Sequence, residues 1–201
     1  HAVVAGADVI TRFVLSGFQS FQAVSHSVCK PFDATRDGIN LGEGASTVIL
    51  TARKEYSNGL RIAGGATSND ANHISGPSRT GEELNMAIRR SMREAGISAD
   101  DIGFISAHGT ATLYNDEMEA KAINLAGLQT VPVNSLKGYY GHTLGAAGLI
   151  ESVITMQSMK EDTIISTLGF SEMGVTQPVN VCASLLQKNI WHSLKTASGF
   201  G

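Results

Sequence analysis

Cysteine and long apolar runs are both scarce in this chain of 201 residues. Its two cysteines, Cys29 and Cys182, are too few for a disulfide framework or for a metal cluster of their own. No run approaches the roughly eighteen apolar residues of a membrane-spanning helix, and the first residues lack the basic start and cleavage pattern of a signal peptide. We therefore expect no membrane span, a reducing compartment and a cytoplasmic location.

Charge of one sign is not in excess either. Fifteen Lys and Arg face eighteen Asp and Glu, so the net charge of -3 gives no electrostatic reason to expect nucleic acid as a partner. The phosphate loop Gly-x-x-x-x-Gly-Lys-Ser/Thr, the zinc motif His-Glu-x-x-His and the nucleophile elbow Gly-x-Ser-x-Gly are all missing. We expect neither a metal nor a cofactor.

Glycine is the residue that stands out. The 22 glycines concentrate in residues 42–44, 64–65, 138–148 and 199–201. In such places the backbone turns sharply or approaches another chain or a ligand closely. Hydrophobic residues at 42 % and charged residues at 16 % are otherwise the ordinary balance of a globular protein.

Short β-rich runs alternate with amphipathic segments along the chain, which predicts an α/β layered fold with a largely buried sheet. The opening run of residues 2–8 is already under way at the first residue, so we expect chain to be missing upstream. Thr80 and Glu83 have the spacing of a capping box, and Gly96 suits a left-handed helix stop. Predicted strands are 2–8, 45–50, 60–63, 102–107, 131–134, 163–166, 179–182 and 190–197; predicted helices are 81–95, 115–126 and 143–160; and residues 69–81 form a predicted loop.

Two histidines lie in polar, glycine-containing loops after successive predicted strands. His108 follows the strand 102–107, and His142 ends the loop after the strand 131–134. A neutral imidazole donates one hydrogen bond from a compact ring, as a group that stabilises an oxyanion must, and the two rings can converge on one oxygen. Each motif alone leaves the function open, because most single histidines in loops are not catalytic.

Several motifs in order carry more information than any one of them. The segment His108-Gly-Thr-Ala-Thr112, followed by Asn115-Asp116 and Glu119, resembles the His-Gly-Thr-Gly-Thr…Asp…Glu segment of β-ketoacyl-acyl-carrier-protein synthases. Lys137 with Gly141-His142-Thr-Leu-Gly145-Ala-Ala-Gly148 and Glu151 resembles their Lys…Gly-His-x-x-Gly-Ala-Ala-Gly…Glu signature. Further matching stretches are Lys30-Pro-Phe-Asp33, Arg36-Asp-Gly38, Gly42-Glu-Gly-Ala45, Asp70-Ala-Asn-His73 with Pro77, and the terminal Gly199-Phe-Gly201. The resemblance covers essentially the whole chain.

The resemblance implies a thiolase-like fold, in which two similar α/β halves build a layered α-β-α-β-α body. Residues 1–58 would be the tail of the N-terminal half and residues 59–201 the C-terminal half. The implied enzyme is a 3-oxoacyl-[acyl-carrier-protein] synthase, an acyltransferase of fatty acid or polyketide synthesis. It would catalyse the decarboxylative Claisen condensation of malonyl-acyl carrier protein with an acyl-enzyme. Implied partners are acyl carrier protein with its phosphopantetheine arm, malonyl and acyl thioesters, and a second subunit in a homodimer or heterodimer.

The same resemblance assigns roles to particular residues. The catalytic set donates hydrogen bonds to the malonyl thioester oxygen and orients the site: His108, Lys137 and His142. The substrate-binding set contacts the pantetheine arm or gates the acyl pocket: Thr110, Thr112 and Phe200. The supporting set consists of Glu151, as ionic partner of Lys137, and Asp116. Two positions depart from the family pattern, because Ala111 replaces a glycine and Ser198 replaces a phenylalanine.

The nucleophilic cysteine of the family lies upstream of the Gly-Ala-Asp stretch that stands here at residues 6–8, so it would precede His1. Cys29 and Cys182 lack an activating context, and we expect both to be structural. We therefore expect the 201-residue chain alone to be inactive. The segment before residue 58 should be its least stable part, and exposed apolar surface should cause self-association or dye binding.

Two other functions stay open at this point. The first is a non-condensing partner subunit that resembles a chain-length factor; retention of His108, Lys137 and His142 together favours the enzyme over it. The second is a thiolase, which would require a Cys-x-Gly stretch near the C-terminus, where this chain has Ser198-Gly-Phe-Gly.

Overall fold

The centre of the fold is a parallel four-stranded sheet. The structure is a computed structural model, and it describes residues 1–57, 59–71 and 76–199. The strand order is β6-β4-β3-β8, with every neighbouring pair parallel. The strands are β3 (Phe104–Ser106), β4 (Pro132–Asn134), β6 (Asn180–Val181) and β8 (Ser193–Lys195). Strands β3 and β4 are buried throughout, as expected for a parallel sheet covered on both faces.

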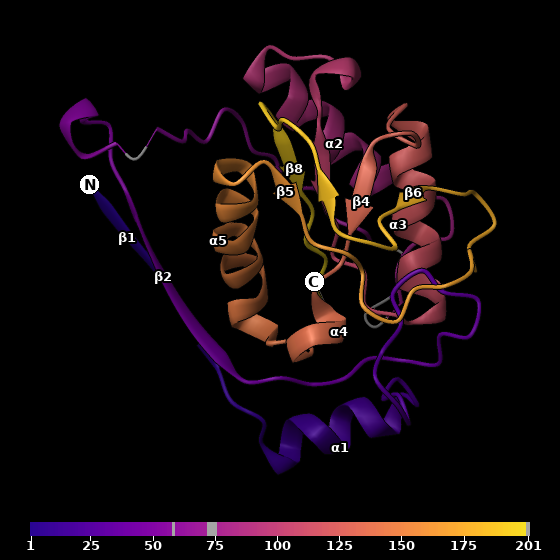
Figure 1. The fold of residues 1–201 in the computed structure, drawn as a ribbon. Helices are drawn as coiled ribbons and strands as arrows, with labels where there is room; N and C mark the ends of the chain where they lie inside the picture. The colour runs from indigo at the N-terminus through magenta and orange to yellow at the C-terminus, as the bar shows by residue number, and fades with distance from the viewer. Residues whose placement is uncertain (58, 72–75, 200–201) are drawn as a thin grey trace.

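Helices cover both faces of this sheet (Figure 1). On one face α2 (Glu82–Ala95) packs against α3 (Leu113–Leu125), and their apolar residues join those of the strands in the main core. On the other face lies α5 (Ala147–Lys160), in contact with β3, β5 and β8. The predicted alternation of strands and helices is thus confirmed, although most strands are shorter than predicted.

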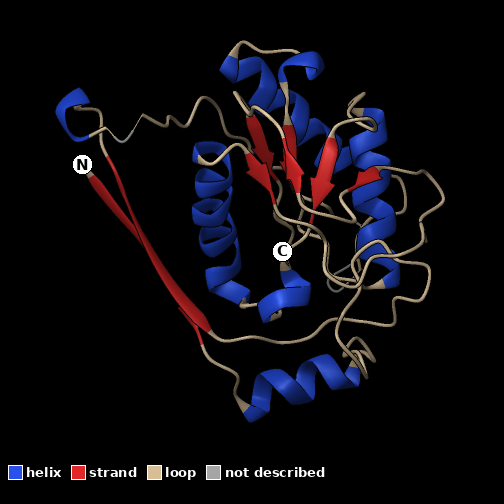
Figure 2. Ribbon diagram, viewed as in Figure 1, coloured by secondary structure: helices blue, strands red, loops and turns tan. Residues whose placement is uncertain are grey.

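A long two-stranded ribbon forms a further layer beyond α5 (Figure 2). Its strands β1 (Ala2–Asp8) and β2 (Gly44–Leu50) pair antiparallel, from Ala2 opposite Leu50 to Asp8 opposite Gly44. Both strands were predicted, but the expectation that the first is buried is wrong: Val3 is 71 % and Ile49 67 % exposed. The reason is that, within the described residues, α5 and the preceding turn η3 (Leu144–Ala146) are the main elements packed against the ribbon, and they cover only part of it. The layers follow one another in the order α2 with α3, the four-stranded sheet, α5 and the ribbon. They correspond to four successive layers of the expected α-β-α-β-α body.

The residues between the two ribbon strands behave in two ways. Helix α1 (Arg12–Ser20), which the sequence did not predict, has no buried residue. By contrast, Phe32 is fully buried and belongs to the main core. Arg36 donates a 2.6 Å hydrogen bond to the carbonyl of Gly174. The segment before residue 58 thus consists of an exposed ribbon and helix together with a well-packed loop; that it is the least stable part of the chain stays a prediction.

Two local predictions around α2 are wrong. Residues 60–63 form no strand, because this stretch runs as a connection between the ribbon and α2 without a neighbouring strand. The capping box is also absent: Gly81 precedes the helix with φ 76° and no side-chain cap, and Ser78 instead hydrogen-bonds both Glu83 and the Gly81 N–H.

A side chain at Gly81 would lie 2.6 Å from the Met118 carbonyl of α3, so the close approach of α2 and α3 requires glycine here. The predicted stop is confirmed, because Gly96 has φ 70°.

The remaining elements are short. The predicted helix 143–160 starts as a separate 3-10 turn, η3, before α5. None of the helices in the described part of the chain combines the length and hydropathy that crossing a membrane requires. The other short elements are η1 (Lys54–Tyr56), η2 (Ala99–Asp101), α4 (Lys137–Tyr140), η3 (Leu144–Ala146), β5 (Thr163–Ile164) and β7 (Leu186–Gln187).

Candidate active site

The loop after β3 is held by two buried carboxylates of α3. Glu119 accepts hydrogen bonds from the backbone N–H of His108 at 2.8 Å and of Gly109 at 2.7 Å. Asp116 accepts from the backbone N–H of Thr110 at 2.9 Å. Both carboxylates are fully buried, and each lies within the first two turns of the helix that follows the loop. Because these backbone donors are buried and need a partner within the protein, the carboxylates fix the loop that carries His108.

The second loop is held by the segment that precedes β2. The His142 N–H donates to the carbonyl of Asn40 at 2.7 Å, and the Gly42 N–H donates to the carbonyl of His142 at 3.0 Å. Leu41 and His142 thus form a parallel β-bridge. A side chain at Gly42 would lie only 2.0 Å from the carbonyl oxygen of Tyr140, so the two backbones meet here because residue 42 is glycine.

The two histidine rings lie side by side. Their centroids are 5.0 Å apart and their planes meet at 82°, an edge-to-face arrangement. The two loops bring them together because β3 and β4 are neighbouring parallel strands, so the residues that follow them leave the sheet at the same edge. The two rings therefore lie next to each other; that their nitrogens face one common oxygen stays a prediction.

Hydrogen bonds to Nδ1 determine the tautomer of each ring. The Leu144 N–H points at His142 Nδ1 from 3.0 Å, and the Lys137 ammonium lies 3.3 Å from His108 Nδ1. Both neighbours are donors, so each Nδ1 must act as acceptor and the proton of each neutral ring sits on Nε2. The site therefore holds two Nε2–H donors.

A buried ionic network stands behind the rings. Lys137 is fully buried, and its Nζ lies 2.6 Å from Glu151 Oε1 while also donating to the carbonyl of His108. The Nζ of Lys195 lies 2.7 Å from the other oxygen of Glu151. The sequence predicted the Lys137–Glu151 pair but missed Lys195. The available signal was a lysine within a predicted strand of a buried sheet, where a charge needs a partner.

Burial and charge keep both imidazoles neutral. Burial, followed by the charges of Lys137, His142 and Lys195, lowers the pKa of His108 well below its usual value. Burial and Lys137 lower the pKa of His142 to about 4. Burial opposes ionisation of Glu151, but Lys195 and Lys137 still hold its pKa below the usual range. At neutral pH the two rings are uncharged hydrogen-bond donors beside a charged network.

The other predicted site residues are placed as follows. Thr110 is buried and Thr112 partly buried, and their hydroxyls are hydrogen-bonded to each other at 2.8 Å. Burial raises the pKa of Asp116 to about 6. Phe200, together with His73 of the resembled loop, lies outside the described residues. Ala111, which replaces a glycine of the family pattern, has φ 60°, a conformation that favours glycine.

Neither cysteine has the environment of a nucleophile. Both are buried, and burial raises the pKa of the Cys29 thiol and raises that of Cys182 to about 11. Both are therefore thiols at neutral pH. Within the described ranges, no group of three or more His, Cys, Asp or Glu side chains is arranged to hold a metal ion.

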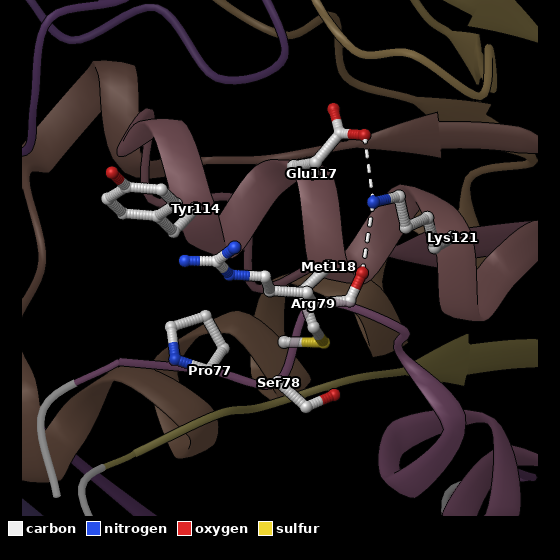
Figure 3. A pocket seen from close by; sticks show the side chains of 7 residues that line it. All are labelled: Pro77, Ser78, Arg79, Tyr114, Glu117, Met118 and Lys121. Atoms are coloured by element: carbon white, nitrogen blue, oxygen red, sulfur yellow. Dashed lines mark hydrogen bonds and ion pairs between the residues drawn. The ribbon is translucent and has the colours of Figure 1, made fainter. Parts of the chain in front are cut away.

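A hollow of about 360 Å³ lies apart from the histidines, between residues 77–79 and α3 (Figure 3). Lys121 bridges its two sides: its Nζ lies 3.3 Å from Glu117 and donates to the carbonyl of Arg79 at 2.9 Å. None of the histidine, lysine or carboxylate groups of the site described above lines this hollow, so it is not part of that site.

The layered fold with two histidines at one edge of a parallel sheet defines a thiolase-like α/β protein. Family models agree: the β-ketoacyl synthase C-terminal domain matches residues 60–171, and the N-terminal domain of the same family matches residues 1–56. The chain belongs to the β-ketoacyl synthase family.

Individual relatives point the same way. The chain is 31 % identical over its whole length to 3-oxoacyl-[acyl-carrier-protein] synthase 2 of Vibrio cholerae, where it covers 53 % of that protein. It is 36 % identical to the Staphylococcus aureus enzyme of the same name, over 79 % of this chain and 43 % of the relative. The chain thus spans about half the length of these curated relatives.

Solved structures share the fold. The ishigamide ketosynthase/chain length factor matches 99 % of this chain and 51 % of its own, with a TM-score of 0.88 and 29 % identity. The ketosynthase ApeO in complex with its chain length factor ApeC, from Xenorhabdus doucetiae, matches 96 % of this chain and 47 % of its own, with a TM-score of 0.83 and 35 % identity.

Proposed function

We propose that this chain is the C-terminal portion of a 3-oxoacyl-[acyl-carrier-protein] synthase that catalyses decarboxylative condensation in fatty acid or polyketide synthesis. The observation that carries the proposal is the pair of imidazole rings with centroids 5.0 Å apart, each with its Nδ1 facing a hydrogen-bond donor, which leaves Nε2 to carry the proton. Two such donors suit a single oxygen that gains negative charge.

The step assigned to this site is loss of carbon dioxide from malonyl-acyl carrier protein. The bond between the α-carbon and the carboxylate breaks, carbon dioxide leaves, and the electron pair spreads from the α-carbon onto the thioester oxygen. His108 and His142 donate hydrogen bonds from Nε2 to that oxygen as its charge grows. A neutral imidazole suits this role because, unlike an imidazolium, it stabilises the anion without readily giving it a proton.

The surrounding residues position these donors. The ammonium of Lys137 fixes His108 through Nδ1 and the His108 carbonyl, and Glu151 balances its charge. Asp116 and Glu119 hold the His108 loop. In this proposal Thr110 and Thr112, with Phe200, contact the pantetheine arm and the acyl chain, and residues 1–58 and 59–201 belong to the N- and C-terminal halves of the enzyme.

The condensation also requires an acyl-enzyme, and neither cysteine of this chain is suited to be its nucleophile. Both of its cysteines are buried thiols, so we expect the 201-residue chain to form no acyl-enzyme with a radiolabelled acyl thioester. Stoichiometric acylation of Cys29 or Cys182 would contradict this. Acyl carrier protein and a second subunit are the proposed partners, and the proposed location is cytoplasmic. In support, one solved relative is described as a ketosynthase in complex with an acyl carrier protein.

The test measures the release of carbon dioxide from malonyl-acyl carrier protein by the full-length protein to which residues 1–201 belong. His108→Ala and His142→Ala should each lower the rate by about 10²–10³, the usual effect of losing one oxyanion donor. His26→Ala is the matched control, because that histidine is exposed and its backbone N–H donates to Asp37. Equal rates in all three variants would refute the proposal.

The alternative is a non-condensing subunit that resembles a chain-length factor, and two of the matched structures contain a chain length factor beside a ketosynthase. Such a subunit would form no acyl-enzyme even in its longest form and would release no carbon dioxide by itself. Acylation measured beside carbon dioxide release therefore separates the two functions.

A further inference from the structure

Lys195 reaches the site because of its position in β8. Strand β8 pairs parallel with β3, and Lys195 stands opposite Ser106. Side chains alternate along a strand, so Leu194 packs with the main core while its two neighbours face α5. Accordingly, Ser193 hydrogen-bonds Met159 of α5 at 3.1 Å, and Lys195 meets Glu151 of α5 at 2.7 Å.

The Nζ of Lys195 lies close to three acceptors of the protein. It forms an ion pair with Glu151 Oε2 at 2.7 Å, contacts the carbonyl of Ala107 at 3.5 Å and donates to the carbonyl of Thr196. These contacts hold the ammonium between α5 and the end of β8.

The groups that Lys195 binds surround His108. Ala107 directly precedes that histidine in the chain. The Thr196 hydroxyl accepts from the His108 N–H at 3.2 Å and donates to Glu119. Lys195 thus connects α5 and the end of β8 to the loop after β3.

Lys195 also changes the charge of the site. Lys137 and Glu151 form a neutral ion pair, so Lys195 adds one positive charge next to two imidazoles. The charged groups that act on the rings come from four elements: Lys137 from α4, Glu151 from α5, Lys195 from β8 and Asp8 from β1. Glu119 of α3 instead faces the backbone N–H of His108. A cation among them opposes the arrival of a proton on either ring.

We propose that Lys195 is a further positioning residue of this site: it binds the second oxygen of Glu151, and its charge keeps His108 and His142 in their neutral, donating form. The contacts stand on the geometry alone, and only their consequence for catalysis rests on the proposed function.

The test is titration of the histidines by NMR in the 201-residue chain. In Lys195→Met the pKa of His142, about 4 in the parent, should rise by about half a unit to one unit, because a unit charge several ångströms away is lost. The pKa of His108 should rise as well. Lys195→Arg keeps the charge and should titrate like the parent. Lys188→Met is the control and should do the same, because Lys188 is exposed and donates to the carbonyl of Gly103 at 3.0 Å.

Identical titrations of Lys195→Met and Lys188→Met would overturn the proposal. Lys195→Gln is the second neutral variant in case the methionine variant does not fold. If both neutral variants unfold while Lys195→Arg folds, the need for a positive charge next to Glu151 is supported. If Lys195→Arg unfolds as well, the role of Lys195 is in packing, and the proposal is wrong.

Activity is a separate readout. In the longest form of the protein, the low-pH limb of carbon dioxide release should move to higher pH in Lys195→Met, together with the histidine pKa values. A parent protein that releases no carbon dioxide while its histidines still respond to Lys195→Met would refute the proposed function and leave the role of Lys195 intact. If the parent protein releases carbon dioxide but the histidine pKa values do not change in Lys195→Met, the role proposed for Lys195 is refuted and the proposed function stands.

Discussion

Glu119 offers a quantitative test of how the His108 loop is held. Its Oε1 accepts the His108 N–H at 2.8 Å and the Thr196 hydroxyl, and its Oε2 accepts the Gly109 N–H at 2.7 Å. In Glu119→Gln one oxygen becomes an amide NH₂. The more favourable orientation of the new side-chain amide keeps its oxygen next to the His108 N–H. Its NH₂ group then faces the Gly109 N–H, so two buried donors point at each other.

The magnitude follows from that lost acceptor. A buried donor without a partner costs about 1–3 kcal/mol, and the remaining hydrogen bonds lose the strength that a charged acceptor gives them. The amide is neutral, so the variant no longer has to bury a charge, and this gain offsets part of the cost. We expect the free energy of unfolding to fall by about 1–3 kcal/mol, and Tm to fall by about 2–4 °C per kcal/mol in a chain of this size.

The assay is thermal and urea unfolding, with amide hydrogen exchange at His108 and Gly109 as a local readout. Glu172→Gln is the control, because that side chain is exposed and its substitution should stay within about 0.5 kcal/mol. An equal free energy of unfolding for both variants, with unchanged exchange at His108 and Gly109, would refute the reasoning.

Three further predictions follow from other parts of the structure. The pKa of His142 is about 4 in the folded chain and about 6.5 in the unfolded chain, so between these pH values the unfolded chain binds a proton that the folded chain does not. The free energy of unfolding should therefore fall by about 3 kcal/mol from this group as the pH falls to 4. Urea titrations at several pH values should show that His142→Gln loses this contribution. Gly42→Ala places a methyl group 2.0 Å from the Tyr140 carbonyl and should cost about 1–3 kcal/mol, whereas Gly17→Ala, with open space around it, should not destabilise the chain. The ribbon and α1 expose Val3, Phe13 and Ile49, so the chain should self-associate or bind a hydrophobic dye and exchange its amides fastest there; a monodisperse monomer that ignores the dye, with uniform protection, would contradict this.

The fold was largely predictable because its strongest signals are local. The periodicity of residues 82–95 and the left-handed stop at Gly96 depend on neighbours in sequence, and both were correct. The errors arose where tertiary contacts decide. Gly81 serves the close approach of α3 and not a capping box, and residues 60–63 have strand-like composition but no strand beside them. Exposure of β1 depends on what covers it, which composition does not encode.

For the candidate site, too, the residues within sequence motifs could be predicted, whereas the contacts made in the folded chain could not. His108, Lys137, His142 and Glu151 stand in motifs that can be read in order along the chain, and the structure brings them together. Lys195 stands in no such motif; its role depends on β8 lying next to α5, a pairing that sequence spacing does not reveal. Glu119 belonged to a motif, but its hydrogen bonds to the loop backbone could only be seen in the folded chain.

The central claim is that the site presents two neutral imidazoles with their protons on Nε2. Nitrogen-15 NMR of the histidine side chains reads protonation and tautomer directly, with assignment by His108→Gln and His142→Gln. We predict that at pH 7 both rings are neutral, with Nδ1 as the hydrogen-bond acceptor and the proton on Nε2. An imidazolium, or a neutral ring with its proton on Nδ1, at either position would contradict the account.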